Sequence, residues 1–127
     1  MTDGETYEGV PLEELAINDI DWTYRGEYIR TRSKRKGPNE FDVEPEWATE
    51  AGLDSNRLVS TTGGKSVEVV GLSLSAPPRA VGDRGRVLKV WIVPKDPADL
   101  SSGLWWGASA CDGNSTDRRD YRERGNE

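Results

Sequence analysis

The residue types that carry out most hydrolytic chemistry are largely missing from this chain. It has no histidine, and Cys111 is its single cysteine. A zinc site built from Cys and His is therefore excluded, as are Ser-His-Asp and Cys-His catalytic groups. Any acid–base chemistry must come from Lys, Tyr, Asp or Glu, with Arg available to stabilise negative charge. We expect neither a bound metal nor another cofactor.

The charged residues are unevenly distributed along the chain. The net charge is -6, which argues against a general nucleic-acid coat protein. Residues 1–21 carry acidic groups and no basic one, whereas residues 25–36 are strongly basic, with Glu27 as their only acid. Residues 40–54 are acidic again. A basic segment between acidic ones either binds RNA locally or folds against its neighbours.

The length of 127 residues suits one domain. We expect residues 1–19 to be an acidic arm, either a tail or loosely docked, and residues 20–125 to form one α+β domain. No apolar run approaches the about 20 residues that a membrane span needs. The acidic N-terminus also lacks the features of a signal peptide. We therefore expect a cytoplasmic protein with no membrane partner.

The first half of the expected domain is helical. Residues 20–22 read as a very short strand, after which Thr23 is placed to cap a helix over residues 24–36. A second short helix is predicted to start near Pro45 and to end at Gly52. The Ser-, Thr- and Gly-rich stretch that follows, residues 54–64, predicts a loop.

The second half is predicted to be a sheet followed by a helix. Apolar alternation predicts strands over residues 66–75, 86–93 and 104–110, and hairpin-length connections favour an antiparallel meander. The expected fold class is therefore α+β: a small antiparallel sheet of three to four strands, two N-terminal helices and one C-terminal helix. Ser115 or Thr116 is the expected N-cap of that last helix.

The last helix carries the most specific pattern. Ser109-Ala110 is followed, after a short linker, by Asp117-Arg118-Arg119-x-Tyr121. This resembles the C-terminal signature of the BrnT family, which runs Ser-Ala-Arg, a linker and Glu-Arg-Arg-x-Tyr. Two predicted strands also begin as strands of that family do, with Ile20-Asp21-Trp22 and with Arg86-Val87-Leu88. The resemblance covers about residues 20–122 and includes the order of the elements.

The resemblance implies a fold, an activity and a partner. BrnT proteins have a RelE-like fold and are the toxin halves of type II toxin–antitoxin pairs. A member would be a metal-independent endoribonuclease, silenced by a small ribbon-helix-helix antitoxin like BrnA. A homo-oligomer within the toxin–antitoxin complex is compatible with this interpretation. RNA and the antitoxin are thus the expected partners.

The resemblance also implies roles for particular residues. Metal-free cleavage of RNA needs a base for the ribose 2′-hydroxyl, an acid for the leaving oxygen and a cation at the phosphate. Arg86 is the expected phosphate clamp, Arg118 and Arg119 stabilise the trigonal phosphate, and Tyr121 stacks on a base or supplies a proton. Lys34, in the basic segment, is the expected base.

Structural interpretations compete with these roles. Arg118 and Arg119 also suit a solvated, ion-paired helix face, and Tyr121 suits an anchor of that helix on the sheet. In the strand pair Trp105-Trp106, one indole is expected in the core and the other on a partner or base-stacking surface.

A rival function therefore stands beside the enzyme. Where the BrnT family has a basic His and an Arg after Ser-Ala, this chain has Asn39 or Glu40 and Cys111. These departures favour a catalytically inactive BrnT-like module that only binds a partner protein. A DNA-binding regulator has little support, because the chain is acidic and has no helix-turn-helix pattern.

Overall fold

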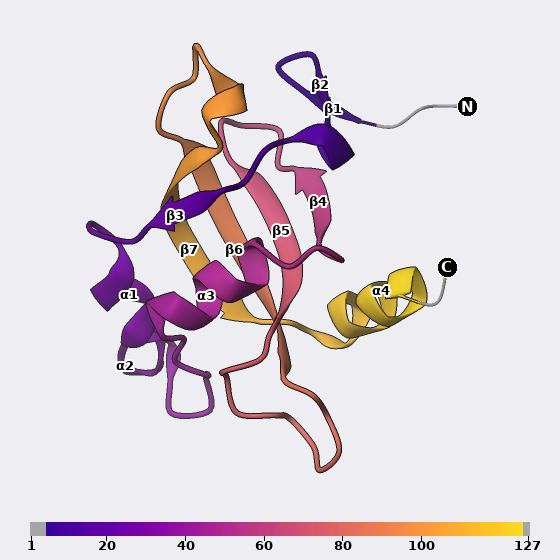
Figure 1. The fold of residues 1–127 in the computed structure, drawn as a ribbon. Helices are drawn as coiled ribbons and strands as arrows, with labels where there is room; N and C mark the ends of the chain where they lie inside the picture. The colour runs from indigo at the N-terminus through magenta and orange to yellow at the C-terminus, as the bar shows by residue number, and fades with distance from the viewer. Residues whose placement is uncertain (1–4, 126–127) are drawn as a thin grey trace.

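A mixed five-stranded sheet forms the centre of the computed structural model, which describes residues 5–125 (Figure 1). The strand order is β3-β7-β6-β5-β4. The bounds are β3 Asp19–Asp21, β4 Leu58–Thr61, β5 Val67–Ser73, β6 Arg86–Pro94 and β7 Leu104–Asp112. Strands β4 to β7 are antiparallel neighbours, whereas β3 runs parallel to β7. The α+β class is confirmed, but the expected purely antiparallel sheet of three to four strands is wrong.

The edge strand β4 accounts for part of this difference. Residues 54–64 were expected to be a loop, but Leu58 to Thr61 pair with Val70 to Val67 in antiparallel register. The Ser, Thr and Gly content belongs instead to the short turn between β4 and β5, where the Thr62 hydroxyl donates to the Ser66 carbonyl at 2.9 Å. The strand forms because β5 supplies backbone partners that the local pattern does not reveal.

Three α-helices lie between β3 and β4 and one follows β7 within the described residues, so the expected arrangement of two N-terminal helices and one C-terminal helix is wrong. Their bounds are α1 Gly26–Arg30, α2 Arg32–Lys36, α3 Pro45–Gly52 and α4 Ser115–Gly125. The helix expected over residues 24–36 is broken at Thr31, which has φ -118° and ψ 27°. Its hydroxyl donates to the Glu27 carbonyl at 2.7 Å, a side-chain bond that competes with regular helix bonding.

The two expected helix caps are also replaced. The backbone N–H and the hydroxyl of Thr23 both donate to Asp21 instead of capping α1. At α4, Asn114 rather than Ser115 or Thr116 is the cap: its Oδ1 accepts the Asp117 N–H at 2.8 Å. The Asn114 N–H in turn donates to Asp117 Oδ2 at 2.9 Å. This reciprocal pair is a capping box and fixes where α4 begins.

The core lies between the sheet and α3. Leu88, Val90 and Ile92 point from β6 into this core and are fully buried. Helix α3 packs so closely on β5 that a Cβ added to Gly71 would lie 1.9 Å from the Ala51 carbonyl oxygen. The opposite face of the sheet is covered at one end by α4. The order of the elements thus brings α4 beside the start of β6 and the loop between β5 and β6 (Figure 1).

The N-terminal arm packs against the same core. It forms a hairpin of β1 Thr6–Tyr7 and β2 Val10–Pro11, then a 3-10 turn, η1 Leu12–Glu14. Tyr7, Leu12, Leu15 and Ile17 are buried core residues. The division of the chain at residues 19 and 20 stays a prediction, and residues 1–4 of the arm lie outside the described part.

Two further features bear on the sequence-based expectations. Trp105 is buried and its indole N–H donates to the Ala16 carbonyl at 2.8 Å, whereas Trp106 is only half-buried, as the alternation predicted. Within residues 5–125, no helix is long and apolar enough to cross a membrane.

Candidate phosphate-binding site

Five arginines surround one pocket of about 420 Å³ at the end of the sheet. It lies between α4, the start of β6 and the loop between β5 and β6. Asp83 is the only acidic residue in its lining. The arginines are Arg79, Arg84, Arg86, Arg118 and Arg122. Guanidinium groups gathered around one hollow form a site for an anion with several oxygens, because each offers a planar set of N–H donors.

Three of these arginines have no carboxylate partner within residues 5–125. In the described part of the chain, no carboxylate lies within ion-pair distance of Arg84, Arg118 or Arg122. Arg118 is positioned by a bond from its Nη1 to the Gly113 carbonyl at 2.8 Å, just before α4. Arg118 and Arg122 are four residues apart, so one face of α4 presents both. The pocket therefore keeps positive charge that a ligand can neutralise.

The other two arginines share a carboxylate. Arg86 donates from Nε and Nη2 to the two oxygens of Asp112, and Arg79 donates to the same group at 3.0 Å. The Arg86 guanidinium also lies 3.8 Å from the centre of the Phe41 ring, and its side chain is 13% exposed. Arg86 lines the pocket as expected, but a phosphate there must compete with Asp112 for it.

Tyr121 lines the pocket, and its hydroxyl proton is already in a hydrogen bond. Its hydroxyl donates to Asp54 Oδ2, and the same oxygen accepts the Leu72 N–H at 2.8 Å. Burial and the bond to Asp54 raise the pKa of Tyr121 well above its ordinary value. The phenol is therefore neutral at pH 7 and anchors α4 to β5. This contact supports the anchoring interpretation of Tyr121 more than the role of a proton donor.

The structure brings together three of the five expected site residues and leaves two outside. Arg86, Arg118 and Tyr121 line the pocket. Arg119 is exposed and pairs with Asp120 at 3.0 Å, and Lys34 is exposed on α2, away from the pocket lining.

Sequence reasoning missed three arginines of the pocket, although one weak signal was present. Arg79 and Arg84 lie in the irregular loop between β5 and β6, where residue spacing has no period to interpret. The i,i+4 spacing of Arg118 and Arg122 was a usable signal, because those two positions share a helix face whereas Arg119 is displaced from it.

Lys89 of β6 is held by an ion pair to Asp117 in the first turn of α4. Its Nζ lies 3.2 Å from Asp117 Oδ2 and 4.0 Å from Glu68 Oε2. Burial alone would lower the pKa of Lys89, but the hydrogen bond and charge of Asp117, with the charge of Glu68, raise it overall. Lys89 is thus a protonated structural partner of α4 and not a free base.

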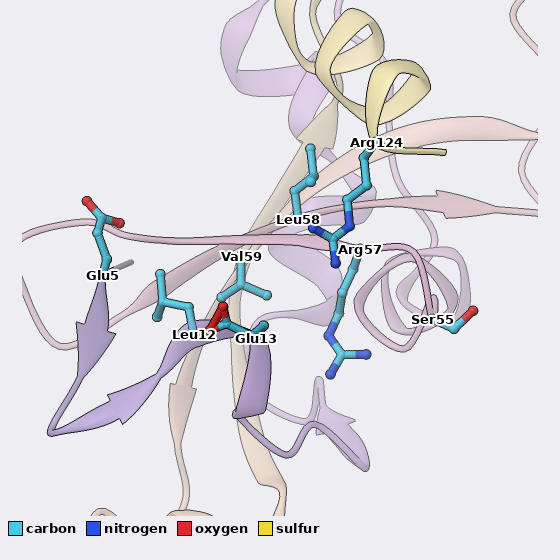
Figure 2. A pocket seen from close by; sticks show the side chains of 8 residues that line it. All are labelled: Glu5, Leu12, Glu13, Ser55, Arg57, Leu58, Val59 and Arg124. Atoms are coloured by element: carbon cyan, nitrogen blue, oxygen red, sulfur yellow. The ribbon is translucent and has the colours of Figure 1, made fainter. Parts of the chain in front are cut away.

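A second pocket, of about 320 Å³, lies by the edge strand β4 and has mixed charge. Figure 2 shows Arg57 and Arg124 there, with Glu5 and Glu13 of the N-terminal arm on the same pocket. Arg57 donates to the Leu15 carbonyl at 3.3 Å and so ties the arm to the start of β4. Because acids balance the bases in its lining, this pocket is a weaker phosphate site than the arginine pocket.

No known protein family, no curated protein and no solved structure matches this chain. The function therefore has to be argued from the site itself and from the residue patterns. In the described part of the chain, no group of three acidic or sulfur side chains is placed to hold a metal ion. What the structure offers is a cationic pocket built by the β5–β6 loop, the strand β6 that directly follows it, and the C-terminal helix α4.

Proposed function

We propose that this chain is the toxin component of a type II toxin–antitoxin pair, with a BrnT-like fold, and that it acts on RNA in the cytoplasm. The observation that carries the proposal is the pocket of five arginines beside α4. Two residues of the pattern Asp117-Arg118-Arg119-x-Tyr121, Arg118 and Tyr121, line this pocket and support the proposal, whereas Arg119 lies outside it. A ribbon-helix-helix antitoxin as partner belongs to the same proposal.

A backbone phosphate of RNA fits the charge and the donors of this pocket. Arg84, Arg118 and Arg122 supply guanidinium groups without a carboxylate partner among the described residues. In metal-independent cleavage, the ribose 2′-oxygen attacks the adjacent phosphorus and the 5′-oxygen leaves. The arginines would stabilise the extra negative charge on the phosphate as this bond exchange proceeds. Local charge, and not the net charge of -6, therefore decides the interaction.

One observation favours the alternative, a module that binds a partner but does not cleave. Tyr121 is the only tyrosine or lysine in the pocket lining, and its proton is held by Asp54. Cleavage needs groups that accept and donate protons in addition to cations. The enzyme hypothesis thus depends on a proton acceptor near the pocket. Asp83, the carboxylate in the lining, is the candidate for that role.

The test is RNA cleavage by the purified protein in the presence of a metal chelator. We expect products that end in a 2′,3′-cyclic phosphate, and loss of cleavage in the double variant Arg118→Ala, Arg122→Ala. Arg119→Ala is the matched control, since Arg119 lies on the same helix but outside the pocket. Binding of RNA by the wild type without cleavage would select the inactive alternative. Absence of both would contradict the proposal.

Induction of the chain in a bacterial host gives a second readout. Growth arrest by the wild type and by Arg119→Ala, but not by the folded double variant, is the result expected of a toxin that uses this pocket. Growth in all three cases, with soluble folded protein present, would count against the toxin. Arrest by all three would keep the toxin and discard the pocket.

A further inference from the structure

The arginine pocket continues into a second hollow on one side. This neighbour, of about 430 Å³, shares Asn56, Leu72, Arg84 and Tyr121 with it and adds Leu53 and Leu74. Glu50 and Asp54 also line it, but Glu50 accepts hydrogen bonds from Ser73 and Ser75, and Asp54 accepts them from Leu72 and Tyr121. Both leucines are unusually open to solvent, with 38% of Leu53 and 64% of Leu74 exposed. We call this hollow the apolar flank. Burial of exposed leucine side chains lowers the free energy. Next to a cationic site, they can therefore bind a flat apolar group that is attached to an anion.

A third hollow adjoins the arginine pocket through Arg79 and Arg86. It also measures about 430 Å³, and its polar lining includes Asn39 and Asn114. The carboxylates Glu40 and Asp112 line it too, but Glu40 is paired with Arg32, and Asp112 with Arg79 and Arg86. We call it the amide flank. Asn114 caps α4, but the amide of Asn39 is exposed and makes no hydrogen bond to any group within residues 5–125. A free carboxamide offers a donor and an acceptor side by side, which is the pattern that reads a base edge.

Phe41 is not available for stacking in the amide flank. One side of its ring faces the Arg86 guanidinium at 3.8 Å, and Trp47 stacks on it with ring centres 5.9 Å apart. This stack holds Arg86 at the junction between the arginine pocket and the amide flank. Recognition on this side therefore relies on hydrogen bonds, whereas recognition on the other side relies on apolar contact.

We propose that these three hollows form one groove for single-stranded RNA, with a phosphate held by the arginines and the neighbouring bases turned into the two flanks. The inference rests on the proposed function and specifies its substrate. In an A-form duplex the bases are stacked and paired, so neither base beside a phosphate can enter a separate pocket. The apolar flank accepts any base, while Asn39 gives the amide flank a preference among bases.

Binding measurements with three RNA ligands of equal length test this proposal on the full chain. The ligands are a single strand of mixed sequence, its duplex, and a ribose-phosphate strand without bases. The variants are Leu53→Ser with Leu74→Ser, Asn39→Ala and, for the phosphate site, Arg122→Ala. Val81→Ser is the matched control, because Val81 is a fully exposed apolar residue of the β5–β6 loop outside the three hollows. Folding of every variant is verified by circular dichroism.

We expect the wild type to bind the single strand at least about fivefold more tightly than the duplex or the base-free strand. The leucine variant should lose that advantage and keep its affinity for the base-free strand, and Val81→Ser should change neither. Asn39→Ala should reduce the differences among single strands that vary in one base.

The contrary results separate the two claims. Equal binding of the base-free strand and the mixed strand, with both weakened by Arg122→Ala, would overturn the base flanks and leave the phosphate site standing. A leucine variant that binds all ligands like the wild type would also overturn them. No binding of any ligand would overturn the proposed function together with this inference.

Discussion

Arg86 holds Asp112 through two parallel hydrogen bonds, from Nε to Oδ1 at 2.9 Å and from Nη2 to Oδ2 at 3.1 Å. This is the geometry in which an arginine binds a carboxylate or a phosphate with two oxygens at once. Asp112 therefore occupies donors that a phosphate would use, and Arg79 binds the same carboxylate. Asp112, which lines the adjoining amide flank, is therefore an internal competitor for two arginines of the pocket.

Replacement of Asp112 by Asn should strengthen RNA binding and weaken the fold. Affinity should rise because one negative charge is removed and Arg79 and Arg86 are released. Stability should fall by about 1–3 kcal/mol, because Arg86 loses a half-buried partner. Fluorescence anisotropy and urea denaturation measure the two effects. Glu14→Gln, which removes one negative charge from η1 outside the site, is the control. Unchanged or weaker binding by a folded Asp112→Asn protein would contradict the competition.

Tyr121→Phe tests whether this tyrosine anchors or catalyses. The variant loses the bond to Asp54, so we expect the free energy of unfolding to fall by about 1–3 kcal/mol. Any RNA cleavage measured below the melting temperature should persist, since the phenol proton is held by Asp54 and the raised pKa keeps it there. Loss of cleavage in a variant as stable as the wild type would make Tyr121 a proton donor after all.

The start of α4 depends on its capping box. Asn114→Ala should lower stability by about 1 kcal/mol, because the Asp117 N–H loses its acceptor. Ser115→Ala and Thr116→Ala should change it by much less, since neither hydroxyl makes a described cap bond. Thermal unfolding of the three variants checks this order. Equal losses at Asn114 and Ser115 would show that the cap is shared.

Asp21 should contribute to acid sensitivity. The hydrogen bond from Lys95, followed by those from Thr23, lowers the pKa of Asp21 to about 2, from 3.8. A carboxyl with a lowered folded-state pKa stabilises the protein above its unfolded pKa, and this contribution is lost as the pH falls through the folded one. Stability should therefore decline between about pH 4 and pH 2, and less steeply in Asp21→Asn. Chemical denaturation at several pH values gives the comparison; identical slopes would exclude this role.

The parts of the fold that sequence predicted are those with a local pattern. Leu88, Val90 and Ile92 alternate along β6, and all three are fully buried. β4 was not predicted because it is stabilised by pairing with β5, and its own composition does not favour a strand. The parallel pairing of β3 with β7 places Ile20 opposite Trp105, and the sequence around either residue does not predict that contact. The central strands β5, β6 and β7 were thus easier to predict than the edge strand β4 or the order of strands in the sheet.

The candidate site divides in the same way. Arg118 and Tyr121 were identified from a motif on one helix, where spacing carries information. Arg79 and Arg84 reach the pocket from an irregular loop, and only the folded chain shows that they face α4. Arg119 was included because the motif contains it, although its helix position points it away from the pocket and toward Asp120.

The central claim is that the arginine pocket binds RNA phosphate, and the most direct test compares two arginines of one helix. RNA affinity is measured as a function of salt concentration for the wild type, Arg122→Ala and Arg119→Ala. We predict that Arg122→Ala weakens binding and reduces the slope of log affinity against log salt by about one, as expected for one lost phosphate contact, while Arg119→Ala stays close to the wild type. Equal effects of the two substitutions, or a larger effect of Arg119→Ala, would contradict the assignment of this pocket.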